Sequence, residues 1–171
     1  GTSSLYFDKI RFAYFDCMIL QREGAEKDYT DLELQQVREL DKTITETEKN
    51  ELVDTIIVKT QGFVNGNIKE GDRHPVAIFR RLLSLYDGID RDALRENLRY
   101  FLQAVMPVCD EYGINMCIHP DDPPFQVLGL PRIVTSEEDI TWLLHAVDNS
   151  HNGLTFCAGS LSAGLHNNVP S

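Results

Sequence analysis

The stretch Met116-Cys117-Ile118-His119-Pro120-Asp121-Asp122-Pro123-Pro124 decides the fold of this chain. A short apolar run ends here in an imidazole, two carboxylates and three prolines. Proline cannot donate a hydrogen bond to a neighbouring strand, and it restricts the residue before it to extended conformations. The pattern predicts that a strand over residues 114–119 stops at His119 and that a rigid turn follows. In α/β proteins the carboxyl ends of strands are where catalytic and binding groups usually lie.

A second predicted strand, residues 154–157, ends in a similar way. It finishes in a thiol, Cys157, and runs into the small residues 158–160. Cys157 lies 38 residues after His119, and a helix is predicted between them. One βα repeat of a barrel takes roughly 30 residues when ~250 are shared among eight repeats. We therefore expect the two strands to be parallel neighbours.

Side chains alternate between the two faces of a strand. By this rule Cys117 and His119 share one face of the first strand, and Thr155 and Cys157 share one face of the second. The opposite faces are apolar throughout and are expected to pack under helices; they carry Met116, Ile118, Leu154 and Phe156. The imidazole and the thiol are thus predicted to lie on matching faces.

The composition is that of an ordinary globular protein. The 171 residues are 42% hydrophobic and 25% charged, which is enough for one substantial core. The net charge of −11 argues against a nucleic-acid surface, which needs clustered positive charge. No apolar run approaches the ~18 residues of a membrane span, and no signal-peptide pattern opens the chain. The cysteines are widely spaced without a Cys-x-x-Cys motif, which favours a reducing compartment and hence the cytoplasm.

The first half of the chain is predicted to be helical. Residues 10–20 are so densely apolar that they suit either a helix or a strand, with Gly24 ending the element. Thr30 and Thr45 each stand three residues before a glutamate, a capping-box pattern that opens a helix. The helix opened by Thr45 is predicted to cover residues 46–57, and another helix is predicted over residues 75–86. The glycine-rich segment 62–71 between them is expected to be an exposed, mobile loop.

The second half alternates helices and strands. The longest helical stripe covers residues 91–112, with Pro107 expected to kink it and Gly113 to cap it in a left-handed conformation. A third capping box over residues 135–138 is predicted to open the helix between the strands. The resulting helix–strand–helix–strand order predicts parallel βαβ architecture. We place a soft boundary near Gly88, with a mainly helical region over 1–88 and a βα segment over 89–171.

His119 and Cys157 are the candidate metal ligands. Imidazole and thiolate together suit a borderline-soft divalent ion such as zinc, iron or manganese. A catalytic site needs at least three protein ligands, and no further pair of this kind stands at a predicted strand end. Asp121 and Asp122 are closest in sequence, but they are expected to order the turn or to support the ligands. The other histidines lack a metal motif and are not expected to bind metal; they are His74, His145, His151 and His166.

Simpler roles for these residues stay open. His119 could end a strand and form a hydrogen bond with the carboxylate of Asp121 or Asp122. Cys157 could be a buried small hydrophobic residue, the usual role of a free cysteine. The pair Gly159-Ser160 is a weak cradle for phosphate or carboxylate, because no helix signal follows it closely.

Several blocks resemble the D-mannonate dehydratases of hexuronate catabolism, of the xylose-isomerase-like type. The most specific blocks are HPDDPP at 119–124 and LGLPRIV at 128–134. The resemblance continues through residues 152–160 and 94–97, and more loosely through 24–30. It covers most of the chain. After Gly159-Ser160 the sequence departs from the family pattern, because residues 161–168 lack the arginine and acidic residues that often follow there.

The resemblance implies a (β/α)₈ TIM barrel with a helical insertion after its fourth strand. Residues 1–88 would be mainly that insertion, and residues 89–171 would supply about strands five and six. In this family Mn²⁺ or Fe²⁺ is held by His, Cys, His and Asp at successive strand ends, of which the first two match His119 and Cys157. The remaining ligands and the catalytic acid and base are expected outside this chain. Residues expected to support the metal ligands or form a substrate loop are Asp121, Asp122, Gly159 and Ser160.

The implied activity is the dehydration of D-mannonate to 2-dehydro-3-deoxy-D-gluconate. The implied partners are this sugar acid and further copies of the chain in a homo-oligomer such as a dimer, with no nucleic acid or membrane. Because a closed barrel needs ~250 residues, the chain is expected to be an interior fragment that binds metal weakly and is inactive alone. Two other hypotheses stay open: a non-catalytic α/β fragment folded by association, and a metal-dependent sugar isomerase on a related barrel.

Overall fold

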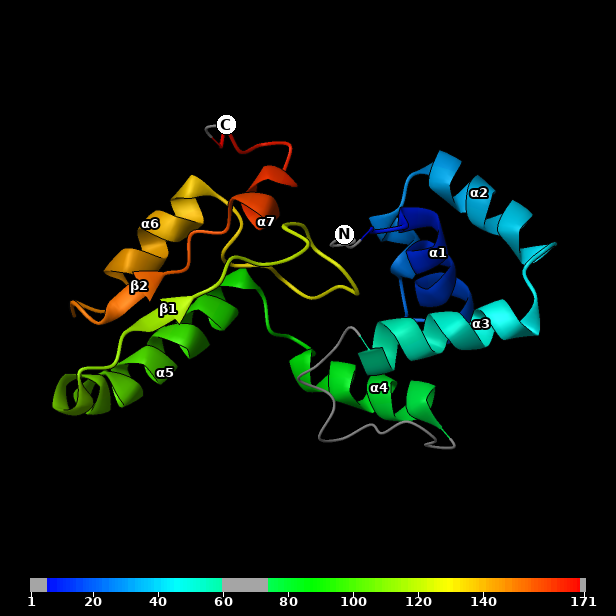
Figure 1. The fold of residues 1–171 in the computed structure, drawn as a ribbon. Helices are drawn as coiled ribbons and strands as arrows, with labels where there is room; N and C mark the ends of the chain where they lie inside the picture. The colour runs from blue at the N-terminus through cyan, green and yellow to red at the C-terminus, as the bar shows by residue number, and fades with distance from the viewer. Residues whose placement is uncertain (1–5, 60–73, 170–171) are drawn as a thin grey trace, which may run out of the picture. The chain divides into compact units, whose positions relative to one another are not determined.

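The computed structural model describes residues 6–59 and 74–169, and most of these residues are helical (Figure 1). The chain divides into two compact units, Gly1–Asp87 and Gly88–Ser171. Within the described part, the only sheet is a parallel pair of short strands in the second unit. The predicted α/β class is therefore confirmed as a mostly helical chain with a small parallel sheet. The predicted mobile loop 62–71 lies outside the described residues.

The first unit consists of helices and helical turns. Its α-helices are α1 Lys9–Tyr14, α2 Asp31–Asp41, α3 Glu46–Val53 and α4 Pro75–Leu83. The π-helical segments Phe15–Leu20 and Asp54–Lys59 continue α1 and α3, and the 3₁₀ turns are Ala25–Asp28 and Ser84–Tyr86. The apolar stretch 10–20, which sequence left undecided, is thus helical. It ends before Gly24, because Gln21 already adopts a left-handed conformation with φ 53°.

The predicted capping boxes of α2 and α3 are both confirmed. The Thr30 hydroxyl accepts from the Glu33 N–H, and the Glu33 carboxylate accepts from the Thr30 N–H. Thr45 and Glu48 form the same reciprocal pair. Each pair satisfies backbone donors that a helix start would otherwise leave without partners.

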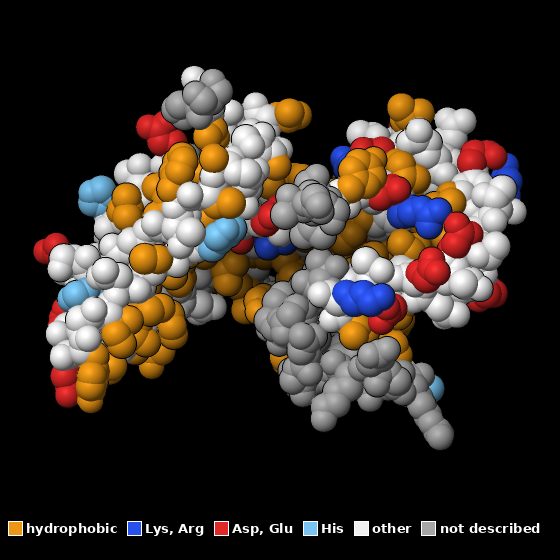
Figure 2. Space-filling model, in the orientation of Figure 1, with side chains coloured by type: hydrophobic (Ala, Val, Ile, Leu, Met, Phe, Trp, Pro, Cys, Tyr) orange, Lys and Arg blue, Asp and Glu red, His pale blue; other side chains and the backbone are white. Residues whose placement is uncertain are grey.

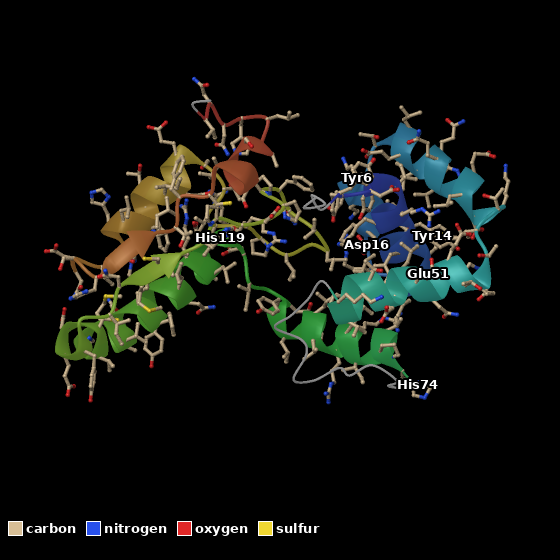
Figure 3. All side chains as sticks on the ribbon, in the orientation of Figure 1. Tyr6, Tyr14, Asp16, Glu51, His74 and His119 are labelled. Atoms are coloured by element: carbon tan, nitrogen blue, oxygen red, sulfur yellow. The ribbon has the colours of Figure 1, made fainter. Side chains whose placement is uncertain are left out.

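A buried carboxylate lies at the centre of the first unit. Asp16 is fully buried and accepts from Arg22 Nε at 2.9 Å and Nη2 at 2.6 Å. The Tyr29 hydroxyl also donates to Asp16, at 2.9 Å. Burial, followed by the negative charge of Asp16, raises the pKa of Tyr29. These bonds tie the segment after the π-helix back onto it; Figure 3 labels Asp16.

The second unit contains the sheet and three helices. Its elements in chain order are α5 Arg91–Tyr112, β1 Met116–Ile118, α6 Glu137–His145, β2 Asn152–Leu154 and α7 Ala158–Ser162. Gly113 caps α5 with φ 64°, as predicted. Pro107 lies inside α5, and the kink expected there stays a prediction. β1 is shorter than the predicted range 114–119, and the predicted range 154–157 is wrong for β2, which begins two residues earlier and shares only Leu154 with it.

The register of the sheet pairs Met116 with Asn152 and Ile118 with Leu154. Met116, Ile118 and Leu154 pack against a core built by α5 and α6, whose buried members include Leu102, Met106, Cys109 and Leu143. Phe156 does not join them and is 65% exposed, so the prediction of an apolar face through Phe156 is wrong. Regular pairing ends at Leu154, and strict alternation ends with it.

The N-terminus of α6 differs from the prediction by one residue. Ser136, not Thr135, is the cap, and it accepts from the Asp139 N–H. Asp139 is fully buried and accepts from the N–H and hydroxyl of Thr135 at 2.9 and 2.8 Å. Arg95 Nη2 donates to the same carboxylate at 2.6 Å, and Arg91 forms an ion pair with it. The two arginines of α5 bind the buried carboxylate of Asp139, whose N–H donates to Ser136. They therefore favour Ser136 as the cap residue.

Part of the α5 surface is apolar. Phe101, Val108 and Tyr112 are 46%, 51% and 67% exposed, and Figure 2 shows hydrophobic side chains gathered over this helix. The other face of α5 packs into the core, at Leu102 and Met106. In the described ranges, no helix combines the length and the apolar character that a membrane crossing requires.

We predict that Asp139→Asn destabilises the second unit by about 3 kcal/mol, because two guanidinium groups lose their buried counter-charge. Burial opposes ionisation of Asp139, but the hydrogen bonds from Thr135 and the charges of Arg95 and Arg91 outweigh it and lower its pKa. The stabilisation should therefore be present above the ordinary carboxyl pKa and be lost as the pH falls through the lowered one. Urea unfolding followed by fluorescence of Trp142, the single tryptophan, measures both effects.

The neighbouring substitution Glu138→Gln is the matched control, because this side chain is 83% exposed. It should change the free energy of unfolding by less than about 0.5 kcal/mol. Equal effects of the two substitutions would show that the buried carboxylate does not hold α5 and α6 together.

Candidate metal centre

His119 directly follows β1 at the strand's carboxyl end (Figure 3). Its Nδ1 lies 2.7 Å from the carbonyl oxygen of Pro120. A carbonyl only accepts, so Nδ1 carries the hydrogen, and in the neutral ring Nε2 is left with the lone pair that a metal or a thiol proton requires. The bond to Pro120 raises the pKa of His119; burial opposes this, while Cys157 and the charge of Asp122 add to it. The turn after β1 thus sets both the orientation and the tautomer of the ring.

Cys157 occupies a different position from the predicted one. It lies three residues beyond the end of β2 and is the N-terminal cap residue of α7, with extended φ −105° and ψ 99°. Its thiol lies close enough to the imidazole of His119 that each group shifts the pKa of the other. The contact becomes possible because the parallel pairing continues past the strands: the Thr155 N–H donates to the Ile118 carbonyl at 2.8 Å.

The Cys157 sulfur has polar partners and is not a buried hydrophobic side chain. The Ser160 hydroxyl lies 3.3 Å from Sγ. The hydroxyl and the backbone N–H of Ser160, with a further contribution from His119 and against the effect of burial, lower the pKa of Cys157 to about 7. A large fraction of this thiol is therefore ionised at neutral pH, and the thiolate is the form that binds metals.

Asp121 orders the turn that carries His119. Its Oδ2 accepts from the N–H groups of Ile133 and Val134, each at 2.9 Å, and its own N–H donates to the Val134 carbonyl. Its Oδ1 lies 3.5 Å from Arg132 Nη1. These bonds join the LGLPRIV segment to the HPDDPP turn, so the two blocks form one structural element.

Asp122 and Ser160 connect the two halves of the candidate centre. The Ser160 hydroxyl lies 3.4 Å from Asp122 Oδ2, and Ser160 itself is buried. Gly159 lies alongside the thiol, since a side-chain carbon at this position would sit 3.9 Å from Sγ. The expectation that no helix follows Gly159-Ser160 is wrong, because both residues lie within α7. This helix has five residues, too few for an anion site at its N-terminus.

The pair His119 and Cys157 fits two positions in the coordination shell of a borderline-soft divalent ion. Among the described residues, no group of three or more His, Cys, Asp or Glu side chains is arranged to hold a metal. The histidines that were not expected to be ligands have other contacts: His145 with Thr141, His151 with Asn115, and His166 with Thr135. Metal binding at the pair therefore stays a prediction, and it needs further ligands.

The segment after α7 is anchored by residues that sequence reasoning missed. Asn167 Nδ2 donates to the carbonyls of Thr135 and Leu161, at 2.7 and 2.9 Å. Asn and His in a loop give no signal for such distant carbonyl partners. Arg91 and Arg95 were also missed, although their spacing of four places them on one face of a helix.

Comparisons with known proteins show the family to which the chain belongs. The family model described as D-mannonate dehydratase (UxuA) matches residues 1–171. A mannonate dehydratase of Chromohalobacter salexigens is 42% identical over 160 residues, covering 94% of this chain and 39% of that protein. One from Marinomonas sp. is 39% identical over 169 residues, covering 99% of this chain and 41% of that protein. The chain thus spans about two fifths of the length of these relatives.

A solved structure, mannonate dehydratase from Streptococcus suis serotype 2, is similar over 48% of this chain and 24% of its own, with 42% identity and a TM-score of 0.46. The chain belongs to the D-mannonate dehydratase family.

We predict that iodoacetamide alkylates Cys157 of the metal-free chain with a rate that rises through a midpoint near pH 7, because the thiolate is the reactive form. Ser160→Ala removes a hydrogen bond to the sulfur and should shift the midpoint upward. Mass spectrometry of the Cys157 peptide over a pH series measures both. A midpoint that is the same with and without the Ser160 hydroxyl would contradict its role.

Proposed function

We propose that an enzyme containing this chain dehydrates D-mannonate to 2-dehydro-3-deoxy-D-gluconate and water, with His119 and Cys157 as two of the ligands of Mn²⁺ or Fe²⁺. The observation that carries the proposal is the parallel register of β1 and β2, which brings the imidazole of His119 and the thiol of Cys157 near each other beyond the carboxyl ends of the strands. Family membership supplies the reaction.

The architecture in this proposal is a (β/α)₈ barrel. The described part supports it through one βαβ unit, β1–α6–β2, with His119 and Cys157 both beyond the carboxyl ends of the strands. Active sites of such barrels lie at this end. Residues 1–88 take the place of a helical insertion, and the remaining metal ligands and the acid and base come from other strands.

The dehydration removes a proton from the carbon next to the substrate carboxylate and a hydroxyl from the adjacent carbon. A bound divalent ion supplies stabilisation of the negative charge that develops beside the carboxylate. His119 presents Nε2, because the Pro120 carbonyl holds Nδ1–H. Cys157 presents a thiolate, because Ser160 donates to its sulfur. Asp121 holds the turn in place, and Asp122 contacts Ser160, so both carboxylates support the ligands.

The cellular setting completes the proposal. Cys17, Cys109, Cys117 and Cys157 are free thiols, which agrees with a reducing compartment, and we place the enzyme in the cytoplasm as a homo-oligomer such as a dimer. The substrate is a small sugar acid.

We expect Cys157→Ser to lower the Mn²⁺ or Fe²⁺ content of the full-length enzyme by about tenfold or more, because a soft ligand is lost. Elemental analysis of the purified protein measures this. Cys117→Ser is the matched control, since Cys117 lies on β1 as an exposed free thiol and its loss should leave the metal content unchanged. Equal metal content in both variants would remove Cys157 from the ligand set.

The reaction is tested separately, with purified full-length protein, added Mn²⁺ and D-mannonate. The expected product is a 2-keto-3-deoxy acid, and His119→Gln should reduce its formation by at least about a hundredfold, because the imidazole ligand is lost. Exchange between an aldose and a ketose without this product would favour a sugar isomerase instead. Formation of neither product by a metal-loaded protein would contradict the proposed function.

A further inference from the structure

The second unit contains an open pocket of about 190 Å³ next to the turn that carries His119. Its lining residues share one feature, the absence of any carboxylate; they are Arg91, Pro124, Phe125, Gln126, Pro131, Arg132 and Thr135. In a chain of net charge −11, a pocket with two guanidinium groups and no acidic wall is unusual. The lining therefore favours an anionic ligand.

Arg132 has hydrogen-bond donors to spare. A guanidinium group carries five N–H donors, and the side chain of Arg132 is only 25% exposed. Its one ion-pair contact in the described structure is Asp121 Oδ1, at the long distance of 3.5 Å, while Asp121 Oδ2 is taken by two backbone N–H groups. Arg132 Nε is buried and has no hydrogen-bond partner among the described residues. A buried donor without a partner is unfavourable unless a ligand supplies the acceptor.

Arg91 contributes a second positive charge to the lining of the pocket. Its partner Asp139 is shared with Arg95, so one buried carboxylate faces two guanidinium groups. Glu138 lies 3.7 Å from Arg95 but is 83% exposed, where solvent screens its charge. The positive charge beside the pocket is therefore not fully neutralised within the unit.

The rest of the lining suits a polyhydroxylated carbon chain. Phe125, Pro124 and Pro131 offer apolar surface to C–H groups, and the Gln126 amide adds groups that hydrogen-bond. An inorganic anion would use the guanidinium groups alone. A sugar acid would use both parts of the pocket, with its carboxylate in the bidentate geometry that arginine favours.

We propose that Arg132 binds the carboxylate of a sugar-acid ligand in this pocket and is thereby a specificity-determining residue. The assignment rests on the proposed function for the identity of the sugar acid. It gives a role to the hydrogen bonds between the LGLPRIV segment and the HPDDPP turn. Asp121 contacts the Arg132 side chain and accepts from the N–H of Val134, and it lies two residues after His119. The carboxylate-binding group and the metal-ligand candidate are thus carried by one hydrogen-bonded loop, residues 119–134.

The test is calorimetric titration of the metal-free full-length enzyme with D-mannonate, D-mannose and inorganic phosphate. D-Mannonate should bind, and D-mannose, which has no carboxylate, should bind about tenfold more weakly or not at all. Arg132→Met should weaken D-mannonate binding by about tenfold or more. Arg132→Lys keeps the charge without the planar fork and should give an intermediate loss. Arg99→Met, which removes the same charge from a side chain paired with Glu96 outside the pocket, should leave the affinity unchanged.

Four results would overturn the assignment: no binding of D-mannonate, equal binding of D-mannonate and D-mannose, phosphate binding as tightly as D-mannonate, or an affinity unaffected by both Arg132 variants. Circular dichroism checks the fold of each variant, and Arg132→Lys carries the test if Arg132→Met does not fold. The proposed function can fail separately. Carboxylate-dependent binding without dehydration by the full-length enzyme would leave the pocket assignment standing, whereas dehydration with an unchanged KM in Arg132→Met would refute it alone.

Discussion

The parallel register of β1 and β2 is the constraint on which the candidate site depends. Pairing Ile118 with Leu154 brings the two strand ends level, and the bond from the Thr155 N–H to the Ile118 carbonyl carries the alignment one residue further. Without this register His119 and Cys157, 38 residues apart in sequence, would have no reason to meet. A shift of one residue would turn one of the two side chains to the other face.

The helices around the sheet preserve that register through one buried charge. Asp139 near the start of α6 accepts from Arg95 and pairs with Arg91, and both arginines lie on the first turns of α5. Since α5 precedes β1 and α6 precedes β2, this ion pair fixes the two helices that lead into the strands. The first unit contains a similar buried ion pair, between Asp16 and Arg22. In each unit a fully buried carboxylate is acceptable because it is completely paired.

The sequence predicted those features whose partners lie close along the chain. Thr30 with Glu33, Thr45 with Glu48, and the Gly113 cap need only neighbours within four residues, so the pattern itself contains the interaction. The end of β1 just before His119 was also recognisable, because proline follows it, whereas the end of β2 at Leu154 was placed three residues too late. The position of Cys157 at the start of α7 was not recognisable either, since no pattern in the sequence indicated the short helix that contains Ser160, the hydrogen-bond partner of the thiol.

Interactions between residues distant in the sequence explain the other differences between the predictions and the structure. Thr135 and Ser136 are equally good caps by local rules, and the arginines of α5, more than forty residues away, decide between them. Phe156 was expected inside because alternation was extended past the last paired residue, yet backbone pairing is what maintains alternation. The pocket beside Arg132 had no signal at all, because its walls come from α5, the proline turn and the LGLPRIV segment, which only the folded chain brings together.

The arrangement of the turn has a consequence for how the site would work. His119, Asp121 and Arg132 belong to one continuous segment whose two ends are joined by the bonds from Ile133 and Val134 to Asp121. A ligand group held by Arg132 is therefore positioned relative to His119 by a short, hydrogen-bonded loop and not by the packing of separate elements. Positioning of this kind places a substrate at a reacting centre with little conformational freedom left to lose on binding. The Ser160 hydroxyl contacts both Cys157 and Asp122, so the thiol is linked to the same turn. Hydrogen bonds thus join the candidate ligands and the pocket in one unit, which is the kind of support that a site aligning a carboxylate with a metal requires.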